Sequence, residues 1–310
     1  MIISKTIKEG EVSFITRKLA DYSQLVKLRL SFLVVFSAGV TFLYASLGHT
    51  AGSGALVSPG INWARFLLLA LGGFLVTGSS NALNQILERD LDRLMHRTRE
   101  RPIPNYRMQP AEGLLIAFFM GAAGLLIVYY LNPLTSFLSL FALLSYAFVY
   151  TPLKQATSLS VYVGAIPGAM PTLIGWAAAT GHITQPALII FLLQFVWQFP
   201  HFWSIAWVLD DDYRRAGFKM MPAGGNRDQK SALYILISAA LLIPVSLIPS
   251  TQHMGGYFLA VVSLCSGILF LLQAIRLYTK CTIKSASRVM LGSFIYLPVV
   301  QLALLIDRLF

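Results

Sequence analysis

Apolar residues occur along this chain in nine long runs that are separated by short polar segments. Most runs are about as long as the roughly 20 helical residues that cross the hydrocarbon core of a bilayer. The runs are residues 28–47, 64–87, 112–131, 133–149, 159–178, 186–207, 232–250, 255–277 and 286–306. The pattern predicts an all-α integral membrane protein with nine transmembrane helices, in which residues 28–310 form one domain behind a polar segment, residues 1–27.

Basic residues mark one side of the predicted membrane protein. All of the 24 Lys and Arg residues except Arg65 and Arg308 lie near the N-terminal segment or in the loops after the second, fourth, sixth and eighth runs. Because Lys and Arg collect in cytoplasmic loops, this distribution predicts a cytoplasmic N-terminus. It also accounts for the net charge of +11 without a nucleic-acid partner, since basic loops are attracted to anionic lipid headgroups.

Acidic residues are scarce, and the predicted topology does not explain where they lie. Eight of the 13 Asp and Glu residues fall in the loops after the second and sixth runs. Asn84, Glu88 and Asp92 are spaced four residues apart, so they share one side of a helix, whereas Asp90 points to the opposite side. These oxygen ligands suit Mg²⁺, which typically joins one or two carboxylates to substrate phosphates.

A second carboxylate cluster, Asp210–Asp212, closes the sixth run. If the two clusters face each other, Asp211 and Asp212 become further metal ligands, with room for two or three Mg²⁺ ions between the clusters. A solvated helix end is the alternative for either cluster taken alone. Both clusters lie on the same predicted face and beside basic residues, which favours a site for a diphosphate and its metal ions.

Basic residues near these clusters suit the diphosphate oxygens that metal ions leave uncovered. Arg97 and Arg101 follow the first cluster, Lys154 follows the fourth run, and Lys219 lies in a Gly-containing loop after the sixth. Arg binds phosphate oxygens in a bidentate manner, and Lys acts as a point charge. The alternative for each of them is a topology signal alone.

Several motifs resemble the UbiA-type intramembrane prenyltransferases. The spacing Asn84-x-x-x-Glu88-x-x-x-Asp92 is similar to the first N-x-x-x-D-x-x-x-D motif of that family, with Glu in place of the first Asp. Nine spans with the N-terminus inside are also typical of the family. The stretches ERDLDRLMHRTRERPIP, FVWQFPHFWSIAW and DDDYRRAGFKMMP resemble the branch of the family that farnesylates protohaem IX.

The second motif of the family, D-x-x-x-D, is altered in this chain. Leu209 and Tyr213 stand at the equivalent places, which leaves Asp212 as the retained carboxylate and Asp211 as a substitute. The second metal site is therefore less well supported than the first.

The resemblance implies a Mg²⁺-dependent transferase in which Asn84, Glu88, Asp92 and Asp212 carry the catalysis. Farnesyl diphosphate ionises, a vinyl group of protohaem IX (haem B) attacks the allylic cation, and water supplies the hydroxyl group of the product, haem O. We therefore expect a multi-pass protein of the cell inner membrane whose active site faces the cytoplasm. Haem A synthase or oxidase assembly factors are the expected protein partners.

Two residues of the stretch WQFPHFW are expected to contact the haem. His201 follows Pro200, which kinks the helix, and an ionisable residue at membrane depth is a functional candidate. It would contact the haem or accept a proton; the alternative is a neutral His bonded to a carbonyl that the proline frees. Trp203 is the second expected contact, with a lipid-facing aromatic as its alternative.

Two rival functions remain open from the sequence. One is prenylation of an aromatic quinone precursor by the same fold. The other is a cation-coupled transporter, although transporters place ionisable groups near the membrane midplane rather than at helix ends.

Overall fold

The computed structural model describes residues 16–48 and 60–309, and most of these residues are helical. The long helices are α2 (Leu28–Ser46), α3 (Trp63–Leu87), α5 (Pro110–Leu131), α6 (Pro133–Leu144), α8 (Ser160–Thr180), α9 (Gln185–Val208), α11 (Gln229–Thr251), α12 (Tyr257–Lys280) and α13 (Ile283–Leu309). The short elements are α4 (Arg89–Asp92), η1 (Ser145–Tyr150), α7 (Thr151–Ala156), α10 (Asp210–Arg215) and η2 (Pro222–Gly224).

Within the described ranges, nine helical segments are long and apolar enough to cross a membrane. Eight of them are single long helices, and the ninth joins α6, η1 and α7 into one span, Pro133–Ala156. The predicted count of nine spans and the all-α fold are therefore confirmed. Residues 1–15 of the predicted N-terminal segment lie outside the described residues, whereas residues 16–25 are helical.

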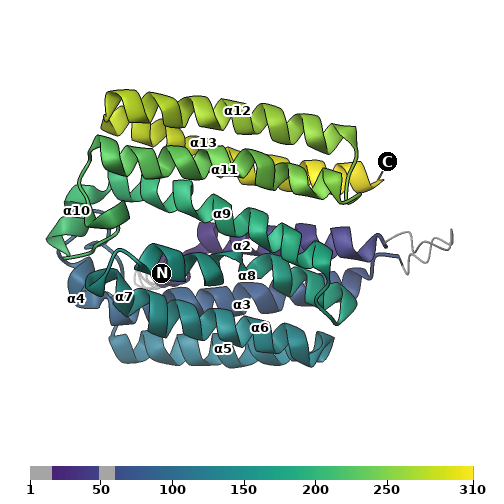
Figure 1. Ribbon diagram of the computed structural model, residues 1–310. Helices are drawn as coiled ribbons and strands as arrows, with labels where there is room; N and C mark the ends of the chain where they lie inside the picture. Colours follow the sequence, from purple (N-terminus) through teal and green to yellow (C-terminus); the bar gives the residue numbers. More distant parts are fainter. Residues whose placement is uncertain (1–15, 49–59, 310) are drawn as a thin grey trace, which may run out of the picture.

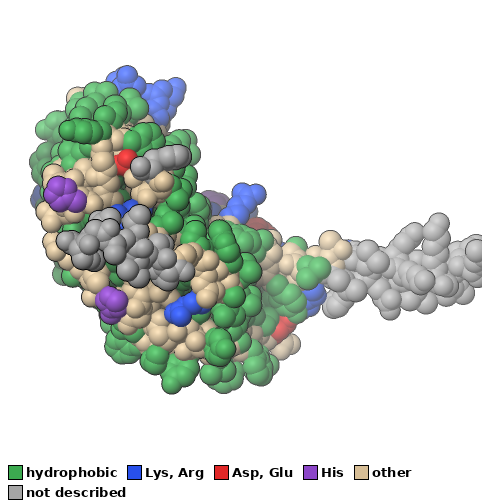
Figure 2. Space-filling model, turned by 90° about the vertical axis from the view of Figure 1, so that its right-hand side faces the viewer, with side chains coloured by type: hydrophobic (Ala, Val, Ile, Leu, Met, Phe, Trp, Pro, Cys, Tyr) green, Lys and Arg blue, Asp and Glu red, His purple; other side chains and the backbone are tan. Residues whose placement is uncertain are grey.

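The helices form one bundle in which α8 and α9 are the most enclosed (Figure 1). In α8, 72% of the most apolar stretch is buried inside the molecule, against 28% in α5 and in α12. Figure 2 shows hydrophobic side chains around the periphery of the molecule, as expected for a surface in contact with lipid. Phe118, Leu126 and Tyr130 belong to this exposed apolar surface.

A glycine allows α2 and α8 to cross closely at the centre of the bundle. A Cβ atom at Gly175 would lie 2.0 Å from the carbonyl oxygen of Ala38, a distance that no side chain tolerates. Small residues are common where membrane helices pack tightly against each other. The close contact holds α2 against the centre of the bundle, where it lines the cavities described below.

The short helices α4, α7 and α10 gather at one end of the bundle (Figure 1). They are the polar extensions of the second, fourth and sixth spans. This end also holds the loops in which the sequence concentrates its carboxylates and most of its arginines. The predicted diphosphate-binding residues come from these extensions and loops, namely Arg97, Arg101, Lys154 and Lys219.

Candidate active site

The end of α3 carries the predicted stripe of oxygen ligands. Helical geometry continues from α3 into α4, because the amide of Asp92 donates a 2.7 Å hydrogen bond to the carbonyl oxygen of Glu88. Asn84, Glu88 and Asp92 are consequently aligned and only 2%, 4% and 1% exposed. Asp90 lies on the other side, exposed and paired with Arg93 at 2.8 Å. The predicted division between the two sides of the helix is confirmed.

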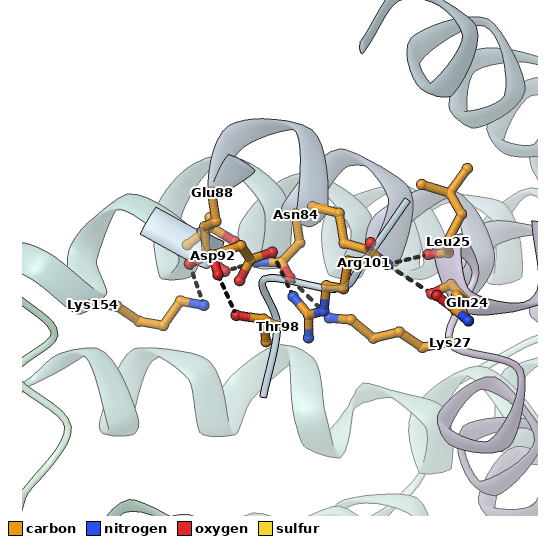
Figure 3. A network of polar contacts seen from close by, with 11 residues as sticks. Gln24, Leu25, Lys27, Asn84, Glu88, Asp92, Thr98, Arg101 and Lys154 are labelled. Carbon is orange, nitrogen blue, oxygen red and sulfur yellow. Dashed lines mark hydrogen bonds and ion pairs between the residues drawn. The ribbon is translucent and has the colours of Figure 1, made fainter. Parts of the chain in front are cut away.

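Three cations contact the three residues of this stripe, one each (Figure 3). The Lys27 ammonium donates a 2.9 Å hydrogen bond to Asn84 Oδ1. Lys154 forms an ion pair with Glu88 Oε1. Arg101 Nη1 lies 2.7 Å from Asp92 Oδ2. The structure therefore places Lys154 and Arg101, two predicted diphosphate ligands, against the predicted metal ligands.

The loop after α4 is tied to this stripe by its own backbone and side chains. Thr98 is fully buried, and its hydroxyl donates a 2.9 Å hydrogen bond to the carbonyl oxygen of Asp92. The bond turns the loop back under α4, which brings Arg97 and Arg101 into one polar cavity beside the stripe. Since both side chains line the cavity, they are available to an anion bound in it.

The fourth span supplies the opposite wall of the cavity. Its six-residue π-helix η1 precedes Pro152, and such irregular turns often lie at functional sites. Tyr146 and Tyr150 of η1 line the cavity. Thr151 follows them, accepting a 3.2 Å hydrogen bond from Asn84 Nδ2 and donating its own hydroxyl to the Tyr146 carbonyl. This chain of bonds fixes the orientation of the Asn84 amide.

The polar cavity is lined by residues from four stretches of the chain, 27–30, 84–101, 146–154 and 213–218. These residues are Lys27, Leu30, Asn84, Glu88, Asp92, Met95, Arg97, Arg101, Tyr146, Tyr150, Lys154, Tyr213 and Phe218. Four of these side chains are cationic and two are carboxylates, so the cavity carries a surplus of positive charge. Such a surplus attracts an anion with several negative charges, as a diphosphate has.

A second, apolar cavity continues from the polar one toward the middle of the membrane. The two cavities share Leu30 and Tyr146 in their walls. The second is walled almost entirely by α2, α3, α6 and α8, with Val35, Leu69 and Ile174 among its apolar residues. The charged head and the apolar tail of one amphipathic ligand can therefore occupy two adjoining cavities.

Lys27 is a site residue that the sequence reasoning missed. It precedes α2 in a left-handed conformation, with φ of 47°, which is uncommon for a residue with a side chain. Burial, together with the charges of Arg101 and Lys154, holds the pKa of its ammonium well below the usual value. Its charge had been assigned to membrane topology, so the missed signal was a Lys directly before an apolar run.

The structure directs the second acidic cluster away from the polar cavity. Asp211 is exposed and pairs with Arg227 at 3.0 Å. Asp212 accepts hydrogen bonds from the amides of His96, at 3.1 Å, and Arg97, at 3.3 Å, and also pairs with Arg215. Neither carboxylate lines the polar cavity. Their role as metal ligands stays a prediction, and it would require both to leave these partners.

Asp212 instead links α10 to the loop that carries Arg97. Burial tends to raise the pKa of Asp212, but the amides of His96 and Arg97 and the Arg215 side chain outweigh it and hold the pKa below its usual value. The carboxylate is therefore charged at neutral pH. A charged acceptor for two loop amides fixes the backbone from which Arg97 reaches the cavity.

Three other predicted site residues also lie outside the polar cavity. Lys219 donates its backbone amide to the Lys154 carbonyl at 2.8 Å and its ammonium to the Ala156 carbonyl at 3.2 Å, so it supports the end of α7. His201 stacks on Trp197, with ring centroids 4.3 Å apart. Trp203 is buried and meets Tyr162 edge-on. The predicted contacts of these residues with substrate stay predictions.

The donor set at the stripe fits a magnesium ion. Asp92 Oδ1 is buried without a hydrogen-bond donor, and Asn84 Oδ1 faces only an ammonium group. In the part of the chain that the structure describes, no three His, Cys, Asp or Glu side chains gather to hold a metal by themselves. That agrees with magnesium chemistry, since Mg²⁺ typically takes one or two carboxylates and completes its shell with phosphate oxygens and water.

Most of the sequence matches a known family. A model of the UbiA prenyltransferase family matches residues 45–297. The chain belongs to this family. As a UbiA prenyltransferase, it is a multi-pass integral membrane enzyme.

Two curated relatives of this chain carry the same name. A protein of Cytophaga hutchinsonii is 38% identical over 290 residues, which cover 93% of this chain and 98% of the relative. A protein of Flavobacterium psychrophilum is 40% identical over 292 residues, covering 93% of this chain and 94% of the relative. Both are named protoheme IX farnesyltransferase.

Solved structures confirm the UbiA fold. A structure described for digeranylgeranylglyceryl phosphate synthase matches with a TM-score of 0.74 at 18% identity, covering 94% of this chain and 99% of the other. A UbiA homolog from Archaeoglobus fulgidus, bound to GPP and Mg²⁺, matches with a TM-score of 0.64 at 13% identity, covering 92% and 99%. At these identities the likeness concerns the fold.

Proposed function

We propose that this UbiA-family enzyme transfers the farnesyl group of farnesyl diphosphate to a vinyl group of protohaem IX, which yields haem O. The observation that carries the proposal is the junction of two cavities at Leu30 and Tyr146, one cationic and one apolar. The cationic cavity suits the diphosphate head of a prenyl diphosphate, and the adjoining apolar cavity suits its prenyl tail. The shared name of the relatives, at 38–40% identity over almost the whole chain, supports protohaem IX as the acceptor.

The head of the substrate is held by the stripe and by the cations around it. Asn84, Glu88 and Asp92 would hold Mg²⁺, whose charge neutralises the leaving diphosphate. Lys27, Lys154, Arg97 and Arg101 line the same cavity and bind the oxygens that remain. When the diphosphate enters, the ion pairs of Lys154 with Glu88 and of Arg101 with Asp92 are expected to loosen, since the phosphate oxygens then compete for the same cations.

The chain assists the departure of the diphosphate by stabilising charge. The C–O bond of the allylic carbon breaks, its electron pair leaves with the diphosphate, and a vinyl group of the acceptor forms the new C–C bond. Fixed cations around the departing oxygens stabilise the developing negative charge. Tyr146, whose side chain lines both cavities, and Tyr150, in the wall of the polar cavity, stabilise the allylic cation.

The acceptor is expected to approach from the side of α9. His201 and Trp203 are proposed to contact it, because both lie in the aromatic part of α9, where Trp203 meets Phe199 and His201 meets Phe202. We place the polar end of the bundle at the cytoplasmic face of the inner membrane, on the basis of its Lys and Arg residues. Haem A synthase or oxidase assembly factors stay the expected protein partners.

An acceptor competition tests this proposal. Purified protein in detergent is given farnesyl diphosphate, Mg²⁺, haem B and an equal amount of 4-hydroxybenzoate, and the products are separated and weighed by mass spectrometry. Farnesylated haem as the main product supports the proposal. Farnesylated benzoate without farnesylated haem would overturn it, and would assign the chain to the quinone-precursor prenyltransferases instead.

A further inference from the structure

A third cavity lies between α2, α9 and α13, and the function described so far makes no use of it. It is walled by Leu33, Val34, Phe36, Ser37, Gly168, Gln194, Trp197, Gln198, Phe294, Leu297, Pro298 and Gln301. No charged side chain is among these residues. The cavity adjoins the apolar farnesyl cavity, with which it shares Val34 and Gly168.

Three hydrogen-bonded side chains form a buried polar cluster in the wall of this third cavity. Gln301 donates from Nε2 to Ser37 Oγ at 2.7 Å and to Gln194 Oε1 at 2.9 Å. Ser37 donates to the same Gln194 oxygen, and Gln194 Nε2 donates to the Gly168 carbonyl at 2.8 Å. The cluster joins α2, α8, α9 and α13 within the membrane-spanning part of the bundle.

Two amides of this wall have hydrogen-bonding capacity left over. Gln301 is 1% exposed, and its Oε1 is buried without a partner. Gln198 is 4% exposed, and its side chain forms no hydrogen bond with another described residue. An uncommitted buried acceptor within a membrane is unfavourable, because neither lipid nor an apolar side chain can satisfy it. A small polar molecule in the cavity would therefore satisfy these amide groups.

The amide of Gln198 lies at the boundary between the third cavity and the farnesyl cavity. A Cβ atom at Gly168, a residue that both cavities share, would be 2.7 Å from Gln198 Nε2. Because Gly168 has no side chain, the Gln198 amide can lie directly against the backbone of α8 at this boundary. A molecule held by Gln198 therefore lies between the farnesyl cavity and α9, the side from which the acceptor is proposed to approach.

A water molecule fits the space and its polar groups. The cavity volume is about 140 Å³, whereas one water occupies ~30 Å³ of the liquid and needs two to four polar partners. Gln301 Oε1 and the two ends of the Gln198 amide provide such partners. The proposed reaction also consumes one water, whose oxygen becomes the hydroxyl group of the product.

We propose that Gln198 and Gln301 hold this reacting water in the third cavity; the proposal rests on the function proposed above. When the terminal vinyl carbon bonds to the farnesyl carbon, the positive charge moves to the vinyl carbon next to the macrocycle. A lone pair of the held water forms the new C–O bond there. The water then loses one proton, and the transfer involves no oxidant or reductant.

We infer that His201, which adjoins the third cavity through Phe294, accepts the proton that the water loses. It lies one helical turn beyond Trp197 and Gln198 on α9, and its ring meets Phe294, a cavity residue, edge-on at 4.9 Å. Ser293 Oγ donates to the Met290 carbonyl at 2.6 Å, so it accepts from His201 Nδ1 at 2.8 Å. Nε2 is then the unprotonated nitrogen. His201 gives the proton up to solvent after the product is released.

Without a positioned water, the same cation has another outcome. It loses a proton from the adjacent carbon and forms an alkene, which is lighter than the hydroxylated product by one water. The ratio of the alkene to the hydroxylated product therefore reports whether water is held at the reacting carbon. A merely structural role of the amides would change the rate or the stability and leave this ratio unchanged.

The test compares products of the wild type, Gln301→Leu and Gln198→Leu by mass spectrometry, under the conditions of the acceptor competition. Gln301 joins three helices, so Gln301→Leu is checked by gel filtration for correct assembly. Gln198 has no such bonds, so Gln198→Leu keeps the test informative if Gln301→Leu is misfolded. The control is Gln273→Leu on α12, where a buried amide oxygen also lacks a partner but lines none of the three cavities.

We expect the ratio of alkene to hydroxylated product to rise by ~10-fold or more in Gln198→Leu, because a held nucleophile reacts far more readily than a free one. Gln273→Leu should match the wild type. An unchanged ratio in Gln198→Leu would overturn the water site even if the rate falls. Absence of any farnesylated haem from the wild type would refute the proposed function itself, so the two failures are distinct.

Discussion

Lys27 and Asn84, which are 57 residues apart in the sequence, share a 2.9 Å hydrogen bond between Nζ and Oδ1 at the polar end of the bundle. The bond joins the start of the first span to the metal stripe on the second. It also shows why the polar cavity can take both a cation and an anion. A metal ion would replace the ammonium at Asn84, and the displaced Lys27 would remain beside the diphosphate as a counter-charge.

The first prediction concerns this lysine. Lys27→Met is expected to raise the KM for farnesyl diphosphate by ~10-fold or more, because a cation that lines the cavity is lost while the stripe remains. Lys27→Arg should retain more of the affinity. Arg29→Met is the control, since Arg29 is exposed and does not line the cavity. Equal KM values for Lys27→Met and Arg29→Met would contradict the role.

Asp92 and Asp90 offer a matched pair of carboxylates two residues apart. Asp92→Asn should lower kcat/KM by ~10²–10³-fold, since it removes a charge that acts on the leaving group. Asp90→Asn should stay close to the wild type, because Asp90 is exposed on the opposite side of the helix. Steady-state assays measure kcat/KM of both variants. Similar losses of kcat/KM would contradict a catalytic role for the side of the helix that carries Asp92.

Glu88 replaces the Asp that is usual in the first family motif, and its charge should matter more than its length. Glu88→Asp is expected to keep substantial activity, whereas Glu88→Gln should lose most of it. The Gln side chain removes the negative charge that faces Lys154 and a bound metal ion. Turnover of both variants at saturating Mg²⁺ provides the measurement, and a fully active Glu88→Gln would exclude a metal role for this residue.

Substitutions of Asp212 and of Asp211 distinguish two possible roles of the second acidic cluster, which are fixing the loop that carries Arg97 and binding metal. If Asp212 mainly fixes the loop that carries Arg97, Asp212→Asn should raise the KM for farnesyl diphosphate several-fold and speed the proteolysis of that loop. Asp211→Asn should behave like the wild type, because Asp211 is exposed and pairs only with Arg227. A large loss of kcat in Asp211→Asn would instead support the prediction that this cluster binds metal.

Much of the fold was predictable because the membrane restricts the choices. A bilayer admits helices of about 20 apolar residues, so runs such as 112–131 and 255–277 translate directly into spans. The polar extensions were harder to predict. Helix α4 and the η1 turn depend on single bonds, such as that of Thr98 to the Asp92 carbonyl, which no periodicity reveals.

The candidate site was predictable where one helix sets the geometry. The shared side of Asn84, Glu88 and Asp92 follows from their four-residue spacing. Their burial follows from their place at the end of α3 and in α4. Lys27 was missed because its contact with Asn84 depends on how α2 packs against α3. The expected approach of Asp211 to the first cluster likewise depended on tertiary structure, and α10 directs its side chain to Arg227 instead.

The central claim is that the α3 stripe binds the diphosphate of a prenyl substrate through Mg²⁺. Titration calorimetry of farnesyl diphosphate into the purified wild type and Asp92→Asn, each with Mg²⁺ and with EDTA, tests it most directly. We predict binding to the wild type that is strong with Mg²⁺ and weak with EDTA, and weak binding to Asp92→Asn in both. Equally strong binding in EDTA, or an unchanged affinity in Asp92→Asn, would contradict the claim.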